Sequence, residues 1–115
     1  MKYLFLLYAD ETGFPPQDSP EAQAVFAAYG AFYEEVSTSG AFQAGDPVQG
    51  SATAKTVSVR DGETAATDGP AHPAGDQIIG FYVLEVADEA EAVALAAKIP
   101  AAGHGRVEAR PIRVM

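Results

Sequence analysis

The sequence has no cysteine and few basic residues, and these two shortages exclude several kinds of protein. Without cysteine there can be no disulfide, no thiolate nucleophile and no Cys-ligated zinc. This is compatible with the reducing cytoplasm, where we expect the protein to work. Seven Lys and Arg stand against 16 Asp and Glu, for a formal net charge of −9. Nucleic acids and anionic membranes bind through a basic face, so we expect neither as a partner.

Long apolar runs and catalytic motifs are missing too. The N-terminal run of residues 3–8 is too short to span a membrane and has no A-x-A cleavage site, so a buried strand is a better interpretation than a signal peptide. No G-x-S-x-G, P-loop, H-E-x-x-H or G-x-G-x-x-G motif occurs. The two histidines, His72 and His104, lie far apart without ligand spacing. We therefore expect no bound metal and no other cofactor.

What the sequence does contain is enough apolar material for a folded domain. Its 115 residues are 48% hydrophobic. A chain of this size can bury a core without disulfides or structural metals. We therefore expect one domain over residues 1–115.

Two helices are marked by their capping residues. Ser19 is a favourable N-cap for the first helix, whose apolar residues recur at helical spacing, and Gly40 favours a stop at its C-terminus. Asp88, followed by Glu91 as in a capping box, predicts the start of the second helix. Pro100 predicts its end.

Six strands are predicted around these helices. The first is continuously apolar, which is typical of a central strand covered on both faces. Asp61-Gly62 is a strong signal for a tight hairpin turn. Pro111 cannot donate to a ladder and therefore requires an edge or a bulge in the last strand. The predicted strands are residues 2–8, 41–44, 55–60, 63–67, 78–86 and 106–114.

The order of elements is β-α-β, a hairpin insertion, and β-α-β again. Two helices on one face of an antiparallel sheet form the α+β, ferredoxin-like arrangement, which is the fold class that we predict. The chain has no further helix to cover the other face of the sheet. A second copy is the natural cover, so we expect a homodimer.

The segment Asp68-Gly69-Pro70-Ala71-His72 is the most interesting one for chemistry. Asp68 could act as a general base or hydrogen-bond acceptor, and His72 as a proton shuttle. The alternative is structural. Asp68 would then cap a turn whose geometry is set by Gly69 and Pro70, and His72 would simply be solvated.

Tyrosine hydroxyls and one arginine are the other candidates. Four tyrosines could line a pocket, although aromatics at such spacing are more often core residues. These are Tyr8, Tyr29, Tyr33 and Tyr82. Arg110, on the same strand face as Glu108, could bind a substrate carboxylate. A cross-strand or intersubunit ion pair is at least as good an explanation.

Several blocks of the sequence occur in an order typical of a known family. The clearest are Thr67-Asp68-Gly69-Pro70 and residues 80–86. The other matching blocks are residues 2–8, 32–35, 40–45, 96–100 and 107–112. On these blocks the chain resembles the DGPF-type branch of the YCII-related family over nearly its full length. The resemblance implies a ferredoxin-like protomer and a dimeric α/β-barrel-type assembly.

The sequence departs from the family pattern in two places. Ala71 stands where the branch usually has phenylalanine, and the acidic-basic run that normally follows is lost, which indicates a remodelled loop. The other YCII branch has a His–Asp pair suspected in catalysis. Here Tyr29 occupies the place of that histidine, while Asp46 falls near the aspartate. Without the histidine, that acid–base chemistry is not carried over.

Our functional hypothesis is a small-molecule-binding domain with a pocket between sheet and helices, near the dimer interface. The sequence leaves open whether it is an enzyme. The residues that we choose for ligand binding are Tyr8, Asp68, His72 and Arg110. The alternative is a non-catalytic regulatory or protein-interaction module. Some members of the resembled branch are linked to transcription, through genomic association with sigma factors.

Overall fold

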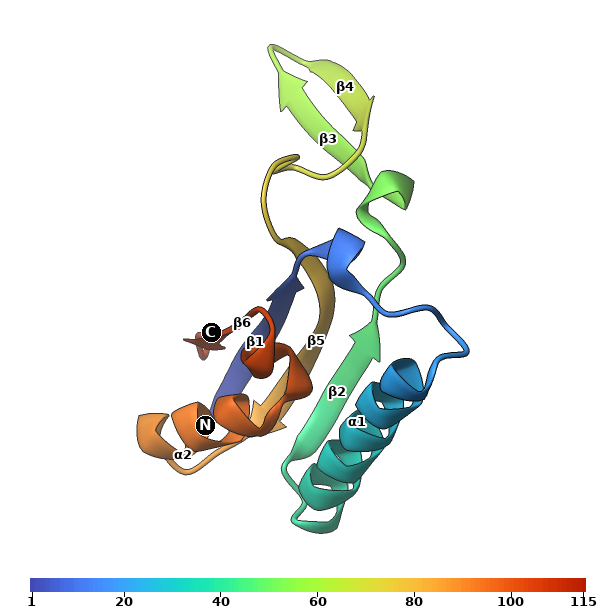
Figure 1. Ribbon diagram of the computed structural model, residues 1–115. Helices are drawn as coiled ribbons and strands as arrows, with labels where there is room; N and C mark the ends of the chain where they lie inside the picture. Colours follow the sequence, from blue (N-terminus) through green and yellow to red (C-terminus); the bar gives the residue numbers. More distant parts are fainter.

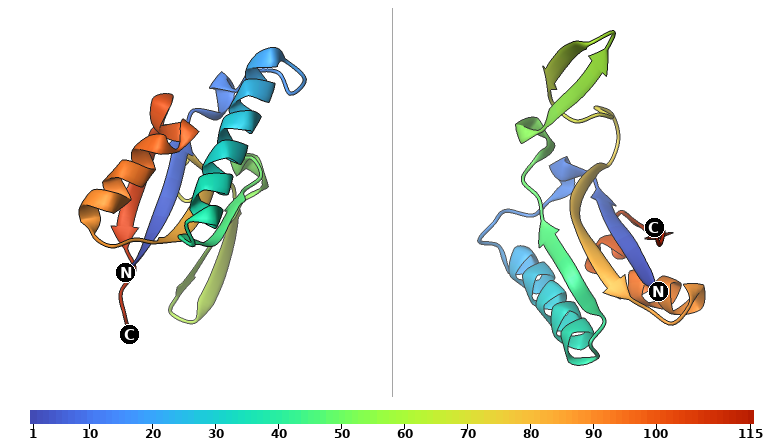
Figure 2. Two further views of the ribbon diagram at one scale, coloured as in Figure 1. Left: turned by 90° about the horizontal axis from the view of Figure 1, so that it is seen from below. Right: turned by 180° about the vertical axis from the view of Figure 1, so that it is seen from behind.

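The computed structural model in Figure 1 describes all 115 residues. Four strands form an antiparallel sheet, both helices lie on one of its faces, and a two-stranded hairpin extends from one end (Figures 1 and 2). The strands are β1 (Lys2–Ala9), β2 (Phe42–Pro47), β3 (Lys55–Arg60), β4 (Glu63–Asp68), β5 (Gln77–Glu85) and β6 (Arg106–Pro111). The helices are α1 (Pro20–Thr38) and α2 (Glu89–Lys98), with short 3₁₀ turns η1 (Glu11–Gly13), η2 (Ser51–Thr53) and η3 (Pro100–Gly103). Neither α1 nor α2 is long and apolar enough to cross a membrane.

The predicted helix caps are confirmed. The Ser19 hydroxyl oxygen accepts a hydrogen bond from the backbone N–H of Ala22 at 3.2 Å. The Asp88 carboxylate accepts one from the backbone N–H of Glu91 at 2.9 Å. Each cap satisfies an N–H that the first helical turn leaves without a partner. Gly40, just beyond α1, has φ +82°, a conformation that favours glycine at a helix end.

The sheet has the strand order β2-β5-β1-β6, and every neighbouring pair is antiparallel. This order is compatible with the ferredoxin-like arrangement predicted from the sequence. β6 is an edge strand, as Pro111 requires. It ends at Pro111 rather than at residue 114, because β1 begins at Lys2 and offers no further partner.

β2 extends to Pro47, beyond the predicted end at residue 44. Gly45 and Pro47 resemble strand breakers in the sequence, but an edge strand tolerates both. Its partner β5 contributes Gly80, where an added Cβ would lie only 3.1 Å from the Asp46 carbonyl oxygen. A glycine at that position lets the two backbones pair closely.

The hairpin arm, β3 and β4 with their turn, stands away from the body of the molecule (Figure 1). Its turn residues Asp61 and Gly62 have φ values of 53° and 78°, as the predicted hairpin turn requires. At the base of the arm, the Gly69 N–H donates to the Ala54 carbonyl at 2.8 Å. The arm thus leaves the sheet and returns to it at nearly one point.

The two faces of the sheet differ in how they are covered. On β1, Tyr3, Phe5 and Leu7 are buried against the helices. The alternating residues Leu4 and Leu6 face the other way and are only half-buried, since no helix lies there (Figure 2). The prediction that the first strand is covered on both faces is therefore fulfilled on only one of them within a single chain.

Candidate functional site

A cavity of about 830 Å³ lies between α1 and the sheet. It exists because α1 buries side chains only in its C-terminal half, where Phe32 and Val36 join the core. In the N-terminal half, Phe26 is 81% exposed although the periodicity of the helix places it on the apolar face. The cavity falls within the range of about 300–1,000 Å³ that is typical of small-molecule sites.

The cavity wall is largely aromatic. Tyr33 of α1 packs edge-on against Phe42 of β2, with ring centroids 5.0 Å apart. Tyr82 of β5 packs edge-on against the core residue Phe32 at 5.2 Å. Gly45 makes room for this arrangement, because a Cβ there would come within 2.6 Å of the Tyr82 ring. Such edge-to-face pairs fix the rings that border the cavity.

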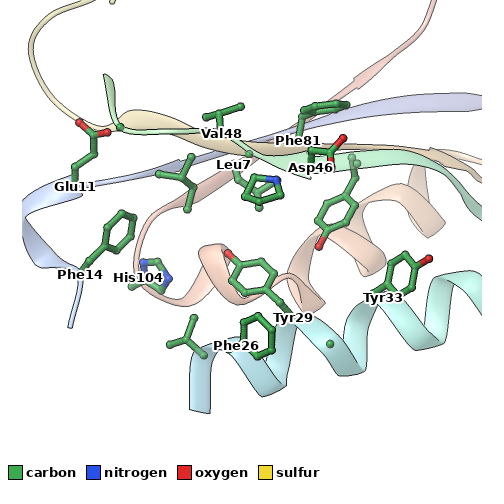
Figure 3. A pocket seen from close by; sticks show the side chains of 18 of the residues that line it. Leu7, Glu11, Phe14, Phe26, Tyr29, Tyr33, Asp46, Val48, Phe81 and His104 are labelled. Carbon is green, nitrogen blue, oxygen red and sulfur yellow. The ribbon is translucent and has the colours of Figure 1, made fainter. Parts of the chain in front are cut away.

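Tyr29 supplies the most conspicuous polar group of the cavity. Figure 3 shows its side chain on the α1 side of the sheet, directed toward the strands. Its hydroxyl oxygen is buried but has no hydrogen-bond partner in the chain. Burial raises the pKa of Tyr29, the neighbouring Tyr82 adds to that rise, and the backbone N–H of Ala101, which points at the phenol oxygen without completing a full hydrogen bond, opposes it and leaves the O–H free to donate. Burial also raises the pKa of Tyr82. Both hydroxyls are therefore neutral at physiological pH and able to donate.

His104 is the one nitrogen-bearing side chain at the cavity. It follows η3, and its ring lies between Phe14 and Tyr29 in Figure 3. Gly105, the next residue, leads into β6 and packs against the backbone of Tyr8. The imidazole can donate or accept a hydrogen bond, so it offers a ligand a second polar group besides the Tyr29 hydroxyl.

Two acidic residues at the cavity already have partners. Glu11 of η1 accepts hydrogen bonds from the backbone N–H of Ser51, at 2.7 Å, and from its hydroxyl. These bonds lower the pKa of Glu11. The Asp10 carboxylate caps η1 by accepting from the hydroxyl and backbone N–H of Thr12, which lowers its pKa as well. The Glu11–Ser51 contact joins η1 to η2, and Glu11 borders the cavity.

Asp46, the residue near the aspartate of the other YCII branch, does not face Tyr29. Its backbone borders the cavity, and its register partner on β5 is Phe81. In Figure 3 the Asp46 carboxylate lies beside Phe81, on the side of the strands away from Tyr29. Tyr29 and Asp46 therefore do not form a working pair.

Two of the sequence-predicted site residues lie at or near the hairpin arm rather than at the cavity. Asp68, at the end of β4, forms an ion pair with Lys55 on β3, and its side chain is 84% exposed. It makes no turn-capping hydrogen bond of the kind that the structural alternative requires. His72 is exposed in the following loop, where its carbonyl accepts from the Gln77 side chain at 2.8 Å.

The other two, Tyr8 and Arg110, lie on the uncovered face of the sheet. In the register of β1 and β6, Tyr8 is opposite Arg106 and Leu4 is opposite Arg110. Arg110 pairs with Glu108 on its own strand. The structure thus brings Tyr8 and Arg110 onto one face, opposite the cavity, and does not bring Asp68 or His72 to them.

Neither Tyr29 nor His104 is among the ligand-binding residues predicted from the sequence. Tyr29 is one of four tyrosines that the sequence places in either a pocket or the core, and its position in the family pattern is the signal that singles it out. His104 gave none, because the turn that carries it to the cavity is a tertiary feature. No group of three or more His, Asp or Glu side chains in the structure could hold a metal ion.

Comparison with known proteins identifies the family. A family profile described as the YCII-related domain matches residues 1–115, the full length of the chain. No match is found among curated proteins.

Proposed function

We propose that this chain, which belongs to the YCII-related family, is a small-molecule-binding domain whose site is the cavity between α1 and the sheet. One observation carries the proposal. A cavity of about 830 Å³ with an aromatic wall is bordered by a buried tyrosine whose O–H donates to no protein group. A buried donor without a partner costs free energy. A bound ligand that opens the packing over the Tyr29 hydroxyl and accepts from it would recover that cost.

The proposal extends to a ferredoxin-like protomer that pairs into a homodimer. The central strands present an apolar strip on the uncovered face, in which Leu4 pairs with Val83 and Leu6 with Phe81. A second copy would bury this strip in an isologous interface. The family resemblance to a dimeric α/β-barrel-type assembly supports the same arrangement, and we expect the dimer to work in the cytoplasm.

We also assign the chain to the DGPF-type branch, on the motif Asp68-Gly69-Pro70. Gly69 has φ +103°, which explains why glycine stands at this turn. The motif ends the hairpin arm and lies outside the cavity. Its role in this chain is therefore to shape the base of the arm.

The alternative, a protein-interaction module, has one observation in its favour. Val57 and Val59 of the hairpin arm are 61% and 55% exposed. Two-stranded hairpins are marginally stable by themselves in water, and a partner protein would cover these valines. The two functions predict different binding positions, a small molecule at the cavity or a partner protein on the hairpin arm.

Fragment binding followed by NMR on ¹⁵N-labelled protein tests the proposal. We expect fragments to perturb amides around Tyr29, Gly30 and His104. Gly30 borders the cavity, and a Cβ there meets nothing within 4 Å, so Gly30→Leu should obstruct the site without strain. Ala27→Leu, on an exposed position of α1 outside the cavity, is the matched control.

The expected result is loss of fragment binding in Gly30→Leu and its retention in Ala27→Leu. Gly30→Leu should be at least as stable as the parent, and Ala27→Leu nearly as stable, because leucine is a better helix former than glycine and only slightly poorer than alanine. Perturbations confined to the hairpin arm, or equal binding in the two variants, would refute the cavity as the functional site.

A further inference from the structure

We infer that the natural ligand is an uncharged aromatic molecule carrying a hydrogen-bond acceptor, and that the cavity selects against carboxylates and phosphates. This inference rests on the proposed function and narrows it to a class of ligand. Three independent features of the cavity lead to it: its charges, its rings and its free donors.

The charges around the cavity disfavour an anion. None of the chain's seven Lys and Arg residues borders it, whereas Asp10 and Glu11 do. Proteins recognise carboxylates and phosphates through arginine, lysine or helix N-termini. The N-terminus of α1 is already capped by its own Ser19. His104 is the one side chain at the cavity that can become cationic.

The rings favour a flat aromatic ligand. Six of the chain's eleven Phe and Tyr rings lie at the cavity; Phe81, which also borders it, directs its ring to the uncovered face of the sheet. Three of them, Phe14, Phe26 and Tyr33, remain about half or more exposed, at 48%, 81% and 52%. Exposed aromatic surface gathered at the edge of a cavity marks a binding site, because a ligand that stacks there removes it from water.

The free donors indicate what the ring system carries. The Tyr29 hydroxyl has no partner in the chain, and the Tyr82 hydroxyl is partly buried beside it. Neutral phenols donate to a carbonyl, ether or hydroxyl oxygen without needing charge on the ligand. A ring bearing one such oxygen would satisfy the Tyr29 hydroxyl while its planar body stacks against the aromatic wall.

The test uses one ring with two substituents. Calorimetric titration compares 2-naphthalenemethanol, which is neutral, with 2-naphthoate, which has a carboxylate on the same ring. We expect the alcohol to bind at least about ten times more tightly. Tyr29→Phe should weaken the alcohol about 3–10-fold, as expected for one lost hydrogen bond. It should leave the binding of unsubstituted naphthalene unchanged.

The other outcomes separate this inference from the proposed function. Naphthoate binding as tightly as the alcohol, or an unchanged alcohol affinity in Tyr29→Phe, would overturn the inference while the cavity remains a binding site. The inference would also be overturned if neither naphthalene derivative bound while aliphatic fragments still bound at the cavity. If no fragment of any kind binds at the cavity, the proposed function itself fails.

Discussion

At the scale of single residues, glycines and one unpartnered hydroxyl determine the site. Gly45 leaves the space that the Tyr82 ring occupies, and Gly80 allows β2 to approach β5. Gly105 has the closest neighbour of all, because a Cβ there would lie 1.9 Å from the Tyr8 carbonyl oxygen. This glycine connects the His104 turn to β6, so it places the histidine at the cavity.

Gly105→Ala should therefore be destabilising, by about 1–3 kcal/mol, as expected for overpacking against backbone. Gly103→Ala is the matched control, since a Cβ at Gly103 meets nothing within 4 Å. It should change stability by less than about 0.5 kcal/mol. Chemical denaturation of the two variants measures the difference. Equal stability would mean that the backbone around His104 adapts easily.

Asp68 gives a second residue-scale prediction. Its ion pair with Lys55 is exposed on both sides, at 84% and 65% of the side chains. Exposed pairs contribute about 0–1 kcal/mol and are screened by salt. Asp68→Asn should therefore cost less than about 1 kcal/mol, and the cost should disappear at 1 M salt. A larger loss that persists at high salt, or a loss of ligand binding in Asp68→Asn, would reinstate a functional role for this carboxylate.

At the scale of elements, the cavity exists because the N-terminal half of α1 and the segment around η1 do not pack closely against the sheet. The apolar face predicted for α1 is present, but only its C-terminal half packs on the core. The N-terminal half is kept in place by its Ser19 cap and by the loop before it. That loop is in turn fixed to η2 by the Glu11–Ser51 hydrogen bonds.

The Glu11 contact predicts a pH-dependent stability. The Ser51 hydrogen bonds hold the pKa of Glu11 below its ordinary value of 4.5. A group with a lowered folded-state pKa stabilises the fold fully above its ordinary pKa, and this contribution is lost as the pH falls through the lowered value. Glu11→Gln should thus be less stable than the parent at pH 7. The difference should shrink below pH 4.5.

Denaturant unfolding at pH 7 and at successively lower pH measures this difference. Glu34→Gln, at an exposed position on α1, is the control. Its difference in stability from the parent should not shrink in the same way as the pH falls. A Glu11→Gln difference that stays constant through the acid range would show that the carboxylate charge does not hold η1 on η2.

At the scale of the whole molecule, the sequence predicted the arrangement better than the site. Caps, turn residues and apolar periodicity are local signals, and they located all six strands and both helices. The cavity could not be predicted in this way, because it depends on how far α1 stands from the sheet. Tyr29 and His104 come to the same cavity through tertiary packing. Asp68 and Arg110 are charged residues that form ion pairs with nearby residues instead.

The last prediction concerns the uncovered face of the sheet. Leu4, Leu6, Phe81 and Val83 form an apolar strip there, and no element of the chain covers it. We expect light scattering at micromolar concentration to give twice the chain mass of 12.0 kDa. Leu6→Asp should produce a monomer, because a buried unpaired carboxylate opposes association. Val93→Asp, at an exposed position of α2, should remain dimeric. A parent protein of 12.0 kDa in solution would refute the dimer. A dimer that survives Leu6→Asp would mean that the two copies pair through another surface, for which the exposed valines of the hairpin arm are the next candidate.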